Sequence, residues 1–278
     1  MSNLSYLAIP AVSAVGAVGA LGSLYLVKRY FAGTYCREKG RLDGRVAIVT
    51  GCNTGIGLET VGELARRGCI VVMACRDVEK AAEAKKRILD MYSGEKYKTY
   101  HINDKSLVED YTPIKEEQLV VLHVDLSDLR SVAVFVQKFS KHHKQCDLLV
   151  CNAGLGICPF QETKDGYEMI MGTNHLGHCL LVELMTSKLN KAEDPRVIMV
   201  SSLLHKSNST LDMENLLMTK DNYSGSRGYR DSKLANVLYA KHLSGRESKI
   251  TAYSLHPGLV RTDIFRHMNI IKRKISNR

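Results

Sequence analysis

The chain has 278 residues, of which 45% are hydrophobic and 24% are charged, and its formal net charge is +10. This composition is that of a globular protein with enough apolar material for one sizeable core, and it excludes a disordered or fibrous chain. The basic residues are spread along the sequence instead of being clustered with aromatic residues. That distribution argues against nucleic-acid binding and favours attraction to an anionic membrane surface.

The eight cysteines include no Cys-x-x-Cys pair, and several lie in apolar runs. We therefore expect reduced, mostly buried thiols, with neither a disulfide framework nor a zinc site. This cysteine pattern fits a reducing compartment.

An uncharged segment opens the chain. Residues 4–27 contain no charged side chain, and Lys28 and Arg29 follow directly. Because about 20 apolar residues suffice to cross a bilayer, residues 1–29 are predicted to be a membrane anchor. Residues 30–44 would be a basic connector that keeps the body on the cytoplasmic or equivalent side. The endoplasmic reticulum and the inner mitochondrial membrane fit equally. A buried core helix and a segment lying in the membrane interface are the alternatives.

Apolar runs and amphipathic segments alternate through the remaining domain, residues 45–278. The apolar runs predict buried strands at 45–50, 70–75, 120–124, 147–151, 196–201 and 250–255. Helical periodicity predicts helices at 55–67, 77–92, 126–144, 165–189 and 229–243. This alternation predicts one α/β domain with a doubly wound parallel sheet and helices on both faces. Ligands of such folds bind beyond the carboxyl ends of the strands.

A glycine-rich turn joins the first predicted strand to the first predicted helix. Glycines allow the backbone to approach a pyrophosphate closely, and the helix N-terminus offers free N–H groups to the phosphates. The turn predicts a dinucleotide site formed by Gly51, Cys52, Asn53, Thr54, Gly55, Ile56 and Gly57. Two later loops should complete it, through Asp125 and Leu126 near the adenine and through Asn152, Ala153 and Gly154.

The end of the second predicted strand indicates which nicotinamide cofactor is bound. An acidic residue there would bind a ribose 2′-hydroxyl, whereas this chain has Arg76, which can bind a 2′-phosphate. Arg67, on the preceding helix, is expected to assist. Asp77 would weaken the argument if it turned inward. We therefore expect NADP(H).

Tyr229 and Lys233 lie one helical turn apart and share a helix face. A free tyrosine has a pKa of about 10, and a nearby ammonium together with an oxidised nicotinamide should lower it. Tyr229 is therefore the candidate that exchanges a proton while the cofactor exchanges a hydride. Ser202 is preferred to Ser201 as the hydrogen-bond partner of the substrate oxygen, because alternation in a strand points them in opposite directions.

Taken in order, these motifs resemble the short-chain dehydrogenases/reductases, which have a Rossmann fold. The resemblance is carried by the Thr50–Gly57 turn, Asn152-Ala153-Gly154, Ser202, Tyr229, Lys233 and Pro257-Gly258. Local sequences also resemble the retinol dehydrogenase branch, namely Ala74-Cys75-Arg76-Asp77, Asn174-His175-Leu176-Gly177-His178 and Ser201-Ser202-Leu203-Leu204-His205.

The resemblance implies an NADP(H)-dependent enzyme that interconverts an alcohol and a carbonyl. Its catalytic residues would be Asn174, Ser202, Tyr229 and Lys233, with Asn174 supporting a water that leads to Lys233. Tyr229 and Lys233 would also contact the cofactor, and Lys233 would hold the nicotinamide ribose. A retinoid-like lipophilic substrate, bound at Ser202, and membrane lipid are the implied partners, and a homo-oligomer stays open. His175 and His178 belong to a structural pattern of the branch, so no metal is expected.

Two segments depart from the family pattern. Residues 91–118 are longer than the family usually carries there, and we expect an exposed, partly ordered insertion. After a segment resembling the nicotinamide contact, at 256–263, the family continues with a substrate-covering region and a seventh strand, whereas this chain ends at Arg278. We therefore expect a sheet that stops before its last strand and has an exposed edge. The competing hypotheses are a catalytically silent cofactor-binding or interaction protein and a membrane tether whose edge pairs with a partner.

Overall fold

The computed structural model describes residues 22–26, 38–98, 105–207, 210–214, 216–258 and 260. The chain divides into two units, Met1–Cys36 and Arg37–Arg278. Residues 22–26 of the first unit are helical, and the rest of the predicted anchor, 1–29, lies outside the described residues. Within the described ranges, no helix has both the length and the apolar character needed to span a bilayer.

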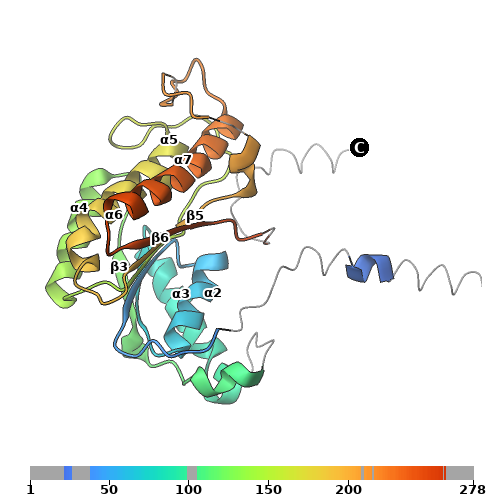
Figure 1. Cartoon of the computed structure of the whole chain (residues 1–278), viewed down its shortest axis with the longest axis vertical. Helices are drawn as coiled ribbons and strands as arrows, with labels where there is room; N and C mark the ends of the chain where they lie inside the picture. Colours follow the sequence, from blue (N-terminus) through green and yellow to red (C-terminus); the bar gives the residue numbers. More distant parts are fainter. Residues whose placement is uncertain are drawn as a thin grey trace, which may run out of the picture. The chain divides into compact units, whose positions relative to one another are not determined.

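One six-stranded sheet forms the centre of the second unit (Figure 1). Its strands are β1 (Val46–Thr50), β2 (Ile70–Cys75), β3 (Leu119–His123), β4 (Leu148–Cys151), β5 (Arg196–Val200) and β6 (Thr251–Leu255). They lie in the order β3-β2-β1-β4-β5-β6, and each neighbouring pair is parallel. The predicted doubly wound sheet is confirmed. Strand order reverses between β1 and β4, which is where such folds open a crevice for a ligand.

Helices cover both faces of the sheet. They are α2 (Gly55–Arg66), α3 (Val78–Met91), α4 (Leu129–His142), α5 (Met169–Met171), α6 (Gly177–Leu189) and α7 (Gly225–Arg246). Helices α2 and α3 pack on one face, and α4, α6 and α7 on the other (Figure 1). The helix predicted at 165–189 is interrupted by a π-helical turn at Gly172–Leu176, and α7 is longer at both ends than predicted.

The strands divide their side chains between two apolar cores. Val46 and Ile48 pack with Phe135 of α4 in one core, and the intervening Ala47 packs with Leu58 of α2 in the other. A parallel sheet that is covered on both faces needs apolar residues at every strand position, because alternate residues point to opposite faces. This explains why the strands appear in the sequence as continuous apolar runs.

The predicted exposed insertion is confirmed in part, because many of its described residues are exposed while a few side chains anchor it to the domain. It contains three short 3₁₀ turns, at Gly94–Lys98, Lys105–Asp110 and Glu116–Gln118. Tyr92, Tyr111 and Gln118 are buried. The Gln118 amide Nε2 donates to the carbonyl oxygens of Ala65, at 2.9 Å, and Cys69, at 3.1 Å. Gln118 therefore caps the carboxyl end of α2.

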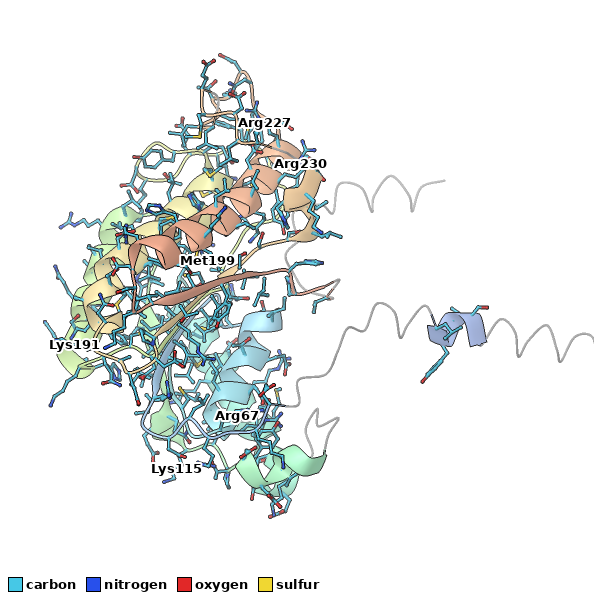
Figure 2. The ribbon with its side chains drawn as sticks, in the orientation of Figure 1. Arg67, Lys115, Lys191, Met199, Arg227 and Arg230 are labelled. Carbon is cyan, nitrogen blue, oxygen red and sulfur yellow. The ribbon has the colours of Figure 1, made fainter. Side chains whose placement is uncertain are left out.

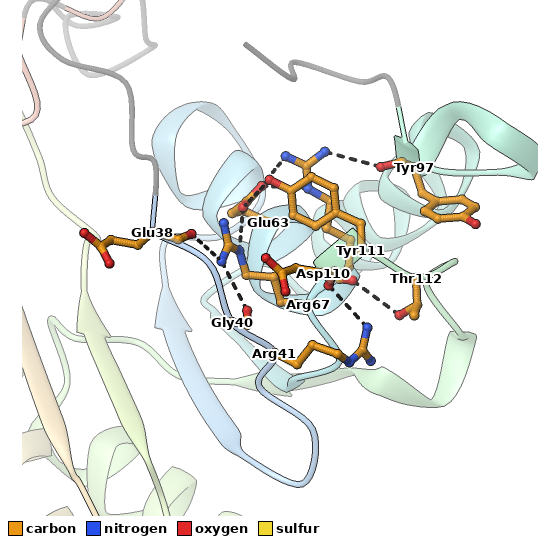
Figure 3. Close-up of polar contacts among 10 residues, drawn as sticks. Glu38, Gly40, Arg41, Glu63, Arg67, Tyr97, Asp110, Tyr111 and Thr112 are labelled. Carbon is orange, nitrogen blue, oxygen red and sulfur yellow. Dashed lines mark hydrogen bonds and ion pairs between the residues drawn. The ribbon is translucent and has the colours of Figure 1, made fainter. Parts of the chain in front are cut away.

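A charged and aromatic cluster attaches the insertion to α2 (Figure 3). The Arg66 guanidinium lies 3.8 Å from the centre of the Tyr111 ring, and the Tyr111 hydroxyl donates to Glu63 Oε1 at 3.2 Å. The Thr112 N–H donates to the Arg66 carbonyl at 2.8 Å. Because Arg66 is only 4% exposed, this cation–π contact is desolvated and is worth up to about 2 kcal/mol.

Strand β6 is the outermost strand on its side of the described sheet, and its residues Tyr253 and Leu255 are exposed. Residues 261–278 lie outside the described residues. The expected absence of a seventh strand therefore stays a prediction.

Candidate functional site

A cavity of about 1070 Å³ opens at the carboxyl ends of the strands. It brings together most of the predicted site, namely Gly51, Asn53, Thr54, Gly55, Ile56, Arg76, Asp125, Leu126, Asn152, Ala153, Gly154, Ser202, Tyr229 and Lys233. Three other predicted residues, Cys52, Gly57 and Asn174, are not part of its lining. They lie behind the wall and support it.

The glycine turn has the shape that a phosphate site requires. Gly51 has a φ of 63°, and a Cβ atom there would lie 2.7 Å from the Cα atom of Ala153. A Cβ atom at Gly57 would overlap the carbonyl oxygen of Gly51 and lie 2.6 Å from Asn152 Nδ2. Thr54 precedes α2 and makes no side-chain capping bond. The free N–H groups of the first turn of α2 are therefore available to an anion in the cavity.

Thr50 joins the glycine turn to the Asn152-Ala153-Gly154 loop, although it was not a predicted site residue. Its hydroxyl oxygen accepts from the N–H groups of Asn152 and Ala153, both at 2.9 Å. Asn152 Nδ2 in turn donates to the carbonyl oxygens of Thr50, at 2.8 Å, and Gly51, at 3.2 Å. Two loops from different strands are thus held as one wall. Thr50 could have been found from the sequence, because it is a hydroxyl residue at the end of a strand that is otherwise apolar.

His178 continues this network into the helix below. Its Nδ1 lies 3.0 Å from the carbonyl oxygen of Asn174, which can only accept, so Nδ1 carries the proton. Its Nε2, 2.9 Å from the Thr50 hydroxyl, is then the acceptor. Burial lowers the pKa of His178 to about 4, so the ring is neutral at physiological pH. Both ring nitrogens are used, which leaves neither for a metal.

Asn174 lies in the π-helical turn and is fully buried. Its Oδ1 accepts from the Leu155 N–H at 2.7 Å, and its Nδ2 donates to the Leu155 carbonyl at 3.0 Å and to Ser232 Oγ at 3.2 Å. The Asn174 carbonyl accepts from Asn236 Nδ2 at 3.2 Å. Asn174 therefore fixes the loop that leads from β4 into the cavity, and its predicted role in catalysis stays a prediction.

Tyr229 and Lys233 both face the cavity from α7, but burial alters them differently from what we expected. The Lys233 ammonium is 2% exposed and donates to the Val200 carbonyl at 2.9 Å. Burial lowers the pKa of Lys233 to about 8. Burial also raises the pKa of Tyr229, which the nearby Ser202 hydroxyl partly offsets. The pKa of Tyr229 is therefore raised in the chain by itself, contrary to the expected direction, and the predicted assistance from an oxidised nicotinamide stays a prediction.

Ser202 and Ser201 have different surroundings. Ser202 lies beside Tyr229 in the cavity wall, where its Oγ accepts from the Leu204 N–H at 3.3 Å, whereas the buried Ser201 Oγ donates to the carbonyl of Lys233 at 2.7 Å. Both residues follow the end of β5 at Val200, so strand alternation is not the reason for the difference. The preference for Ser202 agrees with this arrangement, because only its hydroxyl lies beside the tyrosine.

Three charged residues stand at the end of β2. The Asp77 carboxylate caps α3 by accepting from the Lys80 N–H at 3.0 Å and pairs with Lys80 Nζ at 3.0 Å. Arg76 is exposed and lines the cavity together with Asp77 and with Lys80, which was not a predicted site residue. Lys80 could have been found from its position in the first turn of a helix that begins beside Arg76. Two cations and one carboxylate, which is engaged by Lys80, therefore stand at this end of the cavity.

Arg67 does not take part in the site, so its expected contribution was wrong. It follows the last residue of α2, where its Nε donates to Glu63 and its Nη1 to the carbonyl oxygens of Glu38 and Gly40 (Figure 3). In Figure 2 it lies low in the view, whereas Arg227 near the amino end of α7 lies near the top. The sequence placed Arg67 on the correct helix but at the wrong end of it.

The loop after β3 is rigidified by its own side chains. Asp125 Oδ1 accepts from the N–H of Ser127 at 3.0 Å and from its hydroxyl at 2.7 Å, while the Asp125 N–H donates to Ser131 Oγ at 2.9 Å. Asp125 and Leu126 thereby present a fixed edge to the cavity. Their predicted contact with the adenine stays a prediction.

Comparisons with known proteins agree on one family. A family model described as short chain dehydrogenase matches residues 45–112 and 91–212. Human retinol dehydrogenase 12 is 37% identical over 88% of this chain and 71% of its own length. Human retinol dehydrogenase 13 is 39% identical over 88% of this chain and 68% of its own length. A solved structure of a putative uncharacterized protein from Mycobacterium paratuberculosis is similar with a TM-score of 0.63 and 32% identity, covering 81% of this chain and 72% of that one.

Proposed function

The chain belongs to the short-chain dehydrogenase family, in its retinol dehydrogenase branch, and is an oxidoreductase; on that premise we propose that it interconverts a lipophilic alcohol and its carbonyl with NADP(H). Retinol and retinal are the substrates that we propose to test first, because the relatives at 37% and 39% identity are retinol dehydrogenases.

The proposal depends above all on Tyr229, which lies beside Ser202 at the wall of the cavity. A substrate carbonyl placed between these two hydroxyls would accept from both. Tyr229 would give its proton to that oxygen during reduction and take it back during oxidation. Lys233, whose pKa of about 8 lies near neutrality, would carry its positive charge next to the tyrosine and favour the phenolate once a substrate has taken the proton.

The residues of the cavity fit a dinucleotide. The Gly51–Gly57 turn and the amino end of α2 would hold the pyrophosphate, the Asp125-Leu126 edge the adenine, and the Asn152–Gly154 loop the nicotinamide half. Arg76 and Lys80 would meet a 2′-phosphate, because Asp77 is engaged as a helix cap. When bound, NADP(H) would supply or take up the hydride.

The substrate end of the cavity is apolar at its rim. Leu203 and Leu204, in the 3₁₀ turn after β5, line the cavity and are 53% and 42% exposed, and Val260 lines it at 46% exposure. Sequence reasoning did not name these residues as substrate contacts. Exposed apolar side chains at the mouth of a pocket suit a hydrophobic ligand, because the ligand removes their surface from water.

Attachment to a membrane is part of the proposal. The uncharged stretch at 4–27, the basic residues after it and a lipophilic substrate are consistent with such attachment. Extraction of cell membranes with alkaline carbonate should leave the full chain in the pellet, whereas a chain lacking residues 1–29 should be released.

The central test is NADPH oxidation by the full chain in detergent with all-trans-retinal. Tyr229→Phe should lower kcat at least a hundredfold and leave NADPH binding unchanged, because only the proton donor is removed. Tyr239→Phe is the matched control, since this tyrosine is on the same helix and donates to Glu183. A loss of less than tenfold in Tyr229→Phe would contradict the mechanism. A folded chain that binds NADPH and turns over no carbonyl would be the silent binding protein.

A further inference from the structure

Two thiols meet behind the cavity, where the glycine turn passes the end of β2. Cys52 is fully buried in the turn, and Cys75, the last residue of β2, is 5% exposed and lines the cavity. Both side chains belong to the same apolar core, and Cys52 Sγ contacts the carbonyl oxygen of Ala74, the residue directly before Cys75. The backbone holds them together, because Thr50 is in register with Ala74, and the N–H of Gly51 donates to the Ala74 carbonyl at 3.0 Å.

This geometry is compatible with a covalent link. Cys52 Sγ lies 3.7 Å from the carbonyl oxygen of Ala74, the residue directly before Cys75. Disulfides join Cα atoms that lie about 4.4–6.8 Å apart, and the turn is already hydrogen-bonded at Gly51 to the residue before Cys75. A bond between the thiols would require the side chains to rotate toward each other, because the Cys75 thiol donates to the carbonyl oxygen of Asp77 at 3.3 Å.

The two thiols are not equally reactive. The neighbouring Cys52 thiol lowers the pKa of Cys75, which favours the Cys75 thiolate. The neighbouring Cys75 and burial raise the pKa of Cys52, which keeps Cys52 protonated. Cys75 is thus the better nucleophile and also the one that faces the cavity. Cys69 differs, because burial raises its pKa to about 12 and it is not part of the cavity lining.

We propose that Cys52 and Cys75 are a modification site at which a hydroperoxide that enters the open cavity produces a disulfide. The Cys75 thiolate attacks one peroxide oxygen, the O–O bond breaks, and the released hydroxide takes a proton to become water. Cys75 is then a sulfenic acid. The Cys52 sulfur attacks the Cys75 sulfur, its proton leaves with the expelled hydroxide as a second water, and the S–S bond forms. Two thiols are oxidised and one peroxide is reduced.

A disulfide at this place would affect cofactor binding, an effect that rests on the proposed function. Cys75 lies between Ala74 and Arg76 at the end of the cavity assigned to the adenosine half of the cofactor. A bound dinucleotide would cover Cys75 and exclude the peroxide. Conversely, a link through Cys52 would draw the glycine turn toward β2 and disturb the phosphate site. Cofactor binding and oxidation should therefore be mutually exclusive.

The experiment treats the full chain with hydrogen peroxide, with and without saturating NADPH, and maps tryptic peptides by mass spectrometry without reduction. Trypsin leaves Cys52 in peptide 46–66 but leaves Cys69 and Cys75 together in peptide 68–76. Cys75→Ser must therefore abolish the link between these peptides, while Cys69→Ser must preserve it. Cys52→Ala is a second variant that should stop the oxidation of Cys75 at the sulfenic acid. Binding of NADPH is followed separately by its fluorescence.

We expect the link to form in the free chain, NADPH to slow it at least tenfold, and the linked chain to bind NADPH at least tenfold more weakly until dithiothreitol restores it. If peroxide oxidises other cysteines while 46–66 and 68–76 stay unlinked, or if Cys75→Ser leaves the link intact, the inference is overturned whatever the cofactor does. A link that forms in a chain unable to bind NADPH would uphold the thiol pair and refute the proposed function instead.

Discussion

Replacing Thr50 with valine tests whether one hydroxyl holds the two cofactor loops together. Valine keeps the shape of threonine but removes the oxygen that accepts from the N–H groups of Asn152 and Ala153 and lies 2.9 Å from His178 Nε2. The Asn152 N–H retains its bond to the Val150 carbonyl at 3.0 Å. The change therefore leaves two groups without this partner, the partly buried Ala153 N–H and the fully buried His178 nitrogen.

The expected destabilisation follows from these two groups. A buried polar group that loses its partner destabilises the fold by about 1–3 kcal/mol, so Thr50→Val should lower the free energy of unfolding by about 2–4 kcal/mol. Thr50→Ser keeps the hydroxyl and loses one methyl group, which should cost about 1 kcal/mol. The two variants thus separate hydrogen bonding from packing, since Thr50 is fully buried and both substitutions are smaller than or equal in size to threonine.

Urea unfolding followed by far-ultraviolet circular dichroism would measure both variants against the parent chain. The slope of the unfolding free energy against urea concentration should be unchanged, because unfolding exposes the same surface area in each variant. NADPH binding should weaken in Thr50→Val and be nearly normal in Thr50→Ser. If the two unfolding free energies agree within about 0.5 kcal/mol, the Thr50 hydroxyl does not join the loops and the reasoning fails.

Three further predictions use other parts of the structure. Burial lowers the pKa of Lys233 from 10.5 to about 8. Between these two pH values, Lys233 is therefore protonated in the unfolded chain and neutral in the folded chain. The unfolding free energy of the parent relative to Lys233→Met should then rise by about 2–3 kcal/mol between pH 7.5 and pH 10, and parallel pH profiles would contradict this. Arg76→Ala should weaken NADPH binding at least tenfold and leave NADH binding unchanged, whereas Arg67→Ala should change neither; equal losses for both cofactors would exclude 2′-phosphate recognition. Tyr111→Leu should lower the unfolding free energy by about 2–4 kcal/mol and Tyr111→Phe by about 1 kcal/mol, and no loss in either would mean that the insertion does not stabilise α2.

The sequence determined the succession of strands and helices because that information is local. A strand covered on both faces must be apolar throughout, as in Val46–Thr50, and a surface helix must repeat its apolar residues every three to four positions. The glycine turn and the spacing of Tyr229 and Lys233 are equally local, since backbone conformation and helix pitch place their atoms. These features were predicted correctly before any long-range contact was known.

Tertiary structure alone decided what depends on residues distant in the chain. Four features join separate segments, namely the strand order, the burial of Tyr111 on α2, the position of Arg67 away from the cavity and the contact of Cys52 with the end of β2. The direction in which the pKa of Tyr229 shifts also depends on distant residues. Spacing along a helix predicts that a lysine is near, but burial by the surrounding fold raises the pKa of the tyrosine, because the energy of a charge depends on everything that replaces water around it.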